Sequence, residues 1–172
     1  MEHTEDQARE RDFSNYFEGD EWKLPSDVRV AEPAAQEFLK RLVDAGWDEK
    51  DVGLMELAFD EAIVNAIGHG NLGIPKIGSR EEFLREVLQK QGSAPSDLTV
   101  AVKLNVTRDL AEVTIRDQGN GFDWQSASRS DADAEAEAGR GIRLMESFFD
   151  EVRFNEKGNE VTLVKRFTRA AP

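Results

Sequence analysis

The chain has 172 residues and a formal net charge of −13, which together favour one domain with a buried core. A field of that sign repels nucleic acid and argues against polyanion binding as the main activity. The chain contains no cysteine, which excludes disulfides and cysteine-ligated zinc or iron–sulfur sites. Its two histidines, His3 and His69, are too few for a metal site built from several imidazoles.

Signals for a membrane or for export are absent from this sequence. No apolar run approaches the roughly 20 residues of a membrane span, and the first residues lack the basic and apolar regions of a signal peptide. We therefore expect a cytoplasmic protein that binds neither a membrane nor nucleic acid directly. An anionic ligand would need a local device here, such as a metal ion, backbone amides or one or two arginines.

Helices are predicted mainly in the first half of the chain. Apolar spacing and Pro and Gly positions predict an edge strand at 22–25 and helices over 33–46 and 48–69. The polar residues 1–20 are expected to be a flexible tail before a domain over 21–172. Residues 74–97 form an excursion, in which Ser79 and Glu82 make a capping box and predict a third helix.

Strands are predicted mainly in the second half. Alternating apolar residues predict strands over 98–106 and 111–117, a short helix over 141–149, and a hairpin from 152 to 164. Residues 123–139 are rich in Ser, Ala, Asp and Glu, too polar to pack, and are expected to be a mobile loop. This order of elements indicates an α+β fold of two layers.

The second predicted helix has an unusual polar face. Glu61, Asn65 and Gly68 stack at i, i+4 and i+7, opposite an apolar face. A solvated surface favours strong helix formers, whereas Asn is mediocre and Gly costs ~1 kcal/mol relative to Ala. The face indicates a functional site; the alternative is a solvated helix face with a fraying end.

Two further motifs follow. Asp117 ends a predicted strand, and Gly119 and Gly121 then let the backbone turn and approach a ligand, although a D-x-G-x-G run also occurs in ordinary loops. Gly139, Arg140 and Gly141 begin a helix, where free amides and a charged donor favour an anion. The alternative for this third motif is a flexible hinge.

The order and spacing of these motifs, with a final box around Gly158, resemble the nucleotide-binding boxes of the GHKL superfamily. The runs 65–71 and 145–152 are most similar to the bacterial anti-sigma-factor serine kinases, and the resemblance covers residues 20–168. It implies a two-layer α/β sandwich, with a mixed, mostly antiparallel sheet and helices on one face.

The resemblance also implies a role for each box. Asn65 would ligate Mg²⁺ on the phosphates of ATP, Asp117 would accept from the adenine amino group, and Gly119 and Gly121 would make room for the base. Gly139, Arg140 and Gly141 would contact phosphates, residues 123–139 would be the ATP lid, and Glu61 would be the general base. The usual Gly-Thr of the last box is Gly158-Asn159 here, so Asn159 or Thr162 would support the aspartate.

The implied function is an ATP- and Mg²⁺-dependent serine kinase in a partner switch. It would phosphorylate a STAS-type anti-sigma-factor antagonist and, when free, sequester a sigma factor. Whether the protein forms a homodimer is left open. Two alternatives remain: a non-catalytic ATP-binding module that controls a partner, and the detached ATPase half of a sensor histidine kinase. The excursion 74–97 is longer than these kinases carry and offers a partner surface. His69 is expected to be structural.

Overall fold

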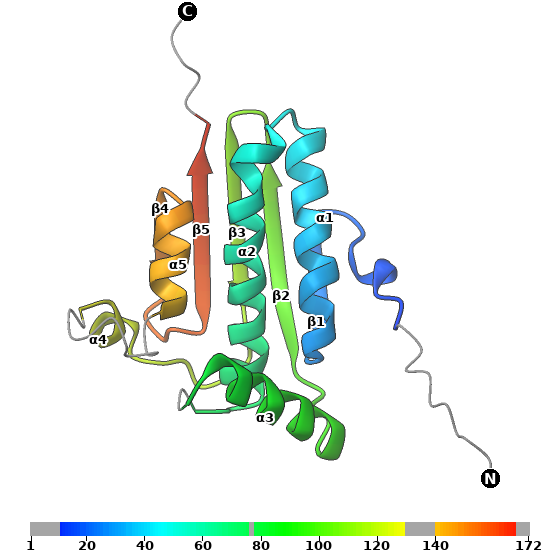
Figure 1. Cartoon of the computed structure of the whole chain (residues 1–172), viewed down its shortest axis with the longest axis vertical. Helices are drawn as coiled ribbons and strands as arrows, with labels where there is room; N and C mark the ends of the chain where they lie inside the picture. Colours follow the sequence, from blue (N-terminus) through cyan, green and yellow to red (C-terminus); the bar gives the residue numbers. More distant parts are fainter. Residues whose placement is uncertain (1–10, 76–77, 130–139, 168–172) are drawn as a thin grey trace, which may run out of the picture.

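The computed structural model describes residues 11–75, 78–129 and 140–167. They form two layers, with one sheet and the helices α1, α2 and α5 on a single face of it, while α3 runs across one end (Figure 1). The α+β architecture expected from the sequence is confirmed. No helix in these three ranges has the length and apolar character needed to cross a membrane.

The sheet has five strands in the order β1-β2-β3-β5-β4, and each pairing is antiparallel. It is therefore more regular than the mixed sheet that the resemblance implied. The hairpin predicted from 152 to 164 and the edge position of the first strand are confirmed. The strands are β1 Glu21–Pro25, β2 Thr99–Val106, β3 Leu110–Arg116, β4 Glu151–Phe154 and β5 Glu160–Arg166.

The helices begin where the sequence places capping residues. Asp48 accepts from the backbone of Lys50 at the start of α2, and Ser79 and Glu82 form the expected capping box of α3. The elements are α1 Ala31–Asp44, α2 Glu49–Asn65, α3 Arg80–Ser93, α4 Trp124–Arg129 and α5 Arg140–Phe148, with 3₁₀ turns Ser14–Tyr16 (η1) and Val28–Val30 (η2).

The helix predicted over 48–69 changes its winding before it ends. Regular α-helix stops at Asn65, and a π-helical segment, η3, continues over Ala66–Asn71. Segments of this wider winding are rare and occur frequently at functional sites. The change falls at Asn65, the residue that the resemblance assigns to the metal.

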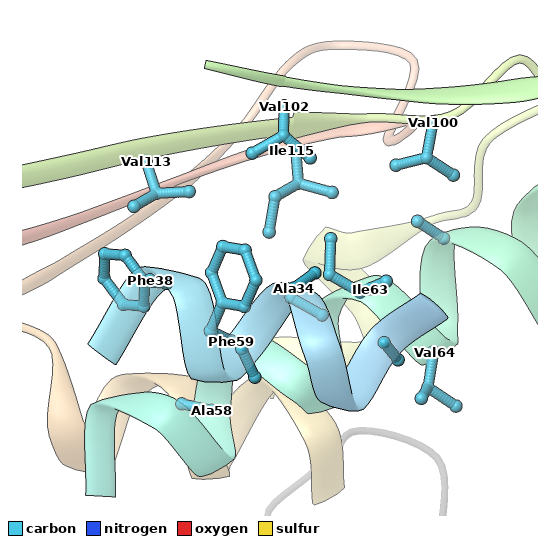
Figure 2. Packing of buried hydrophobic residues seen from close by; sticks show 14 of the residues in the cluster. Ala34, Phe38, Ala58, Phe59, Ile63, Val64, Val100, Val102, Val113 and Ile115 are labelled. Carbon is cyan, nitrogen blue, oxygen red and sulfur yellow. The ribbon is translucent and has the colours of Figure 1, made fainter. Parts of the chain in front are cut away.

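The core lies between the helices and the sheet. Alternate residues of β2 and β3, including Val100, Val102, Val113 and Ile115, point down onto the helices. Phe38 of α1 and Phe59 of α2 stack beneath them with ring centroids 4.7 Å apart (Figure 2). The opposite face of the sheet carries polar side chains, because strand side chains alternate between faces.

The segment expected to be a tail packs on the domain in its described part. The Phe13 side chain is only 4% exposed and belongs to the core cluster. Arg11 pairs with Asp27, and η1 contacts β1. Residues 1–10 lie outside the described residues.

Candidate functional site

Three distant parts of the chain meet at one end of α2. They are the π-helical segment η3, the loop after β3 and the start of α5. Two cavities open between them, and Asn65 and His69 line both. Asn65 therefore borders both cavities.

The inner cavity is mostly apolar, and the partly buried carboxylate of Asp117 lies at its wall. Ala62, Ile142 and Met145 line it together with Phe122 and Phe154, whose rings meet edge to face at 5.5 Å. Asp117 also lines this cavity, and burial raises the pKa of its carboxyl group, although the N–H of Gly119 donates to Oδ1 at 2.8 Å. Such a pocket suits a flat heterocycle with an amino group that donates to Asp117.

The backbone turns so tightly here that side chains are excluded. A Cβ at Gly119 would lie 2.3 Å from the carbonyl oxygen of Gly70, and Gly121 has a φ of +76°. A Cβ at Gly70 would itself lie 2.3 Å from the carboxyl carbon of Asp117. Gly121 lines the inner cavity, as does Gly70, which was not among the predicted site residues.

Asn159, and not Thr162, supports the aspartate. The Asn159 amide donates to the backbone oxygen of Asp117 at 2.9 Å, and the Asp117 N–H donates to the Asn159 carbonyl at 2.9 Å. Thr162 lies on the other face of the sheet, with its hydroxyl 3.0 Å from that of Thr114. The placement of Thr162 in the nucleotide site was therefore wrong, because alternation along β5 turns it away from the core.

The outer cavity has a volume of about 450 Å³ and carries positive charge. Arg140 and Arg143 of α5 and Arg80 of α3 line it. Arg140 is the first residue of α5, where a helix favours anions. Gly139, predicted beside it, lies outside the described residues, as does the expected lid from residue 130 onward; residues 124–129 form α4.

At Gly141, α5 approaches α2 closely. A Cβ there would lie 2.8 Å from Asn65 Nδ2 and 3.0 Å from Glu61 Oε1. The structure thus brings Gly141 against both polar residues that the sequence placed on one helical face. Gly68, the third member of that face, packs under α3, where a Cβ would meet Phe83 at 2.4 Å.

Glu61 is held from two sides. Asn65 Nδ2 donates to its Oε1 at 3.3 Å, and Arg80 donates to its Oε2. Arg80 also lies 3.7 Å from Asp60, so one guanidinium contacts two neighbouring carboxylates of α2. Burial raises the pKa of the Asp60 carboxyl group, whereas Arg80 acts to lower it.

The donor set fits a magnesium ion that is held mainly by phosphates. Because Nδ2 of Asn65 donates to Glu61, its Oδ1 is the oxygen that the amide offers to a cation. No group of three or more His, Cys, Asp or Glu side chains suited to a metal occurs in the described ranges. Mg²⁺ keeps several waters and commonly binds through one or two protein oxygens plus substrate phosphates.

Besides Gly70, the sequence analysis missed two further residues at the site. Asn71 links η3 to the loop after β3, since its Oδ1 accepts from the Gln118 N–H at 2.7 Å and its Nδ2 donates to Thr99. Arg80 belongs to the excursion. The one local sign of a special role is its position in the first turn of a helix, where acidic residues are favoured over basic ones. His69 stacks on Phe83 at 4.1 Å with Nδ1 2.7 Å from the Ile74 oxygen, a contact consistent with a structural role.

An apolar pocket with a partly buried acceptor, next to a cavity lined by arginines, suits a nucleotide. Comparison with known protein families matches residues 22–165 to the histidine kinase-like ATPase domain. The chain belongs to this family, which supports ATP as its ligand. A comparison with curated proteins finds no match.

Proposed function

We propose that this domain is an ATP- and Mg²⁺-dependent serine protein kinase of the anti-sigma-factor type. It phosphorylates a serine of a STAS-type antagonist and, when free of that antagonist, binds a sigma factor. The observation that carries the proposal is the position of Glu61, one helical turn from Asn65 and facing the outer cavity. A carboxylate there lies next to the place where the phosphates would be held.

Each residue then has a task in the transfer. Asp117 and the inner cavity hold adenine, while Arg140 and the start of α5 neutralise phosphate charge. Asn65 would hold Mg²⁺, which supplies charge neutralisation at the β- and γ-phosphates. The serine oxygen forms a bond to the γ-phosphorus, the bond to the bridging oxygen of ADP breaks, and Glu61 accepts the serine proton.

The proposal is tested by transfer of labelled phosphate from ATP to a purified STAS-type antagonist. We expect an acid-stable phosphoserine on the antagonist, in contrast to the acid-labile product of a histidine kinase. Glu61→Gln should bind ATP and transfer phosphate at least about a hundredfold more slowly, within the range of general-base catalysis. Glu56→Gln, the same change on the same helix more than a turn away, is the matched control. Transfer by Glu61→Gln at the wild-type rate contradicts the role of Glu61.

A second function is favoured by one specific contact. Arg80 engages the Glu61 carboxylate, and a carboxylate paired with a guanidinium is less available to accept a proton. A non-catalytic module that reads ATP against ADP for a partner needs no free base. The same assay separates the two, because the module binds ATP and yields no phosphoserine with any antagonist.

A further inference from the structure

The strongest feature that the proposed function leaves unexplained is Arg80. It belongs to the excursion helix α3, and yet its side chain lines the outer cavity together with Arg140. It contacts Glu61, which lies nineteen positions earlier in the sequence. The Arg80 side chain is 42% exposed, while that of Glu61 is 16% exposed, so the guanidinium stands on the solvent side of the carboxylate.

The folding of α3 does not account for this arginine. Ser79 and Glu82 already satisfy the start of the helix through the capping box. A positive charge in the first turn opposes the helix dipole, and acidic residues are favoured there. Arg80 is thus unfavourably placed for its own helix, and the anions that stabilise it lie across the cavity on α2.

The two cavities fix a direction for the nucleotide. Asp117 marks the adenine end in the inner cavity, and Asn65 borders both that cavity and the outer one. A chain of phosphates that passes Asn65 enters the space lined by Arg140 and Arg80. In a chain of net charge −13, these guanidinium groups are the local positive charge that a triphosphate requires.

We propose that Arg80 binds the γ-phosphate, exchanging Glu61 for it, and thereby makes the site discriminate ATP from ADP. A phosphate offers more anionic oxygens than a carboxylate and accepts the planar guanidinium through two hydrogen bonds. When Arg80 leaves, Glu61 still accepts from Asn65, so it is not left without a hydrogen bond. The carboxylate becomes free to act as a base only while a triphosphate is bound.

This inference rests on the proposed nucleotide site but does not require phosphoryl transfer. Calorimetric titration with Mg²⁺-ATP and with Mg²⁺-ADP tests it directly. We expect Arg80→Ala to bind ATP about tenfold more weakly or worse, as the loss of a charge-assisted hydrogen bond implies. Binding of ADP should change by less than about twofold, because ADP lacks the group that Arg80 contacts.

Two further variants make the test specific. Arg80→Lys keeps the charge without the planar fork and should lose part of the preference for ATP. Arg85→Ala removes an exposed arginine of the same helix, paired with Glu81 at 3.5 Å, and should bind both nucleotides as the wild type does. Thermal unfolding checks that each variant is folded. If Arg80→Ala does not fold, the comparison of ATP and ADP binding by Arg80→Lys and Arg85→Ala tests the proposal instead.

The exchange itself is tested with Glu61→Gln. Without a carboxylate to hold it, Arg80 should bind ATP more tightly than in the wild type, and this gain should largely disappear when Arg80 is also changed to Ala. Equal losses for ATP and ADP in Arg80→Ala, or no loss for either, would overturn the proposal. If the preference for ATP depends on Arg80 while no phosphoserine forms, the kinase proposal fails and this one stands.

Discussion

At the scale of single residues, the Asp117 carboxylate lowers the stability of the fold while it favours the binding of ATP. Burial raises the pKa of its carboxyl group, so the folded protein holds this proton more tightly than the unfolded chain does. The protonated carboxyl group therefore contributes its whole stabilising free energy at a pH below the unfolded pKa of about 3.9. This contribution is lost as the pH rises through the higher pKa of the folded protein. At neutral pH the ionised, buried side chain therefore lowers the free energy of unfolding.

Asp117→Asn should separate these two effects. We expect the variant to unfold at a higher temperature than the wild type at pH 7, with the gain shrinking as the pH falls towards 4. Binding of ATP should weaken about tenfold or more, because the amide oxygen keeps the hydrogen bond from Gly119 and the amide then presents an NH2 donor to the adenine amino group. Calorimetry and thermal unfolding across pH measure both. Asp109→Asn, an exposed site in the β2–β3 turn, should change neither; a destabilised Asp117→Asn at pH 7 contradicts the argument.

The same scale shows what the sequence could and could not predict about the site. The positions of Glu61, Asn65, Asp117, Gly121 and Gly141 around the two cavities were predictable, because their types and spacing depend on local backbone geometry. The prediction for Thr162 was wrong, although the alternation of side chains along a strand could have corrected it. Val161 and Leu163 face the core, so the residue between them faces away. Arg80 was not predictable, since its contact with Glu61 depends on how α3 docks, which no local pattern encodes.

At the scale of elements, the site depends on how closely α5 approaches α2. At Gly141 an added Cβ would press on the ends of the Asn65 and Glu61 side chains, which can shift. Gly141→Ala should therefore change the free energy of unfolding by less than about 1 kcal/mol, but it should weaken ATP binding because it displaces the Asn65 amide and the Glu61 carboxylate. Urea unfolding and calorimetry measure the two effects.

Gly53→Ala provides the matched control. Gly53 lies in α2 with nothing within 4 Å of an added Cβ, so alanine should stabilise the helix by up to about 1 kcal/mol without altering ATP binding. If Gly141→Ala also binds ATP normally, the close approach of α5 has no functional role.

At this scale the first residues of the helices could be predicted from the sequence, whereas the change of winding at the end of α2 could not. Capping side chains at Asp48 and Ser79 act within a few residues and can be recognised directly. The change to π winding after Asn65 instead accompanies tertiary contacts: Gly68 lies under Phe83 and Val87, and Gly70 lies against Asp117. Local periodicity therefore extended one regular helix too far, to His69.

At the scale of the whole molecule, the net charge and the local charge of the outer cavity act on an anionic ligand in opposite directions. The net charge of −13 repels Mg²⁺-ATP at long range, whereas the arginines of the outer cavity attract it at short range. The Debye length falls from about 30 Å at 0.01 M salt to about 8 Å at 0.15 M. Added salt therefore screens the distant carboxylates before it screens the guanidinium groups that contact the ligand.

This difference in range predicts an unusual salt dependence. The association rate of Mg²⁺-ATP should rise as sodium chloride increases from about 0.01 to 0.15 M, in contrast to the fall expected of a basic, electrostatically steered site. Stopped-flow kinetics can follow binding through Trp124, which stacks on Phe154 at the wall of the inner cavity. Adenosine carries no charge, so its association rate should not respond to salt. A rate for Mg²⁺-ATP that falls steadily over this range would mean that the local arginines, and not the net charge, dominate the encounter.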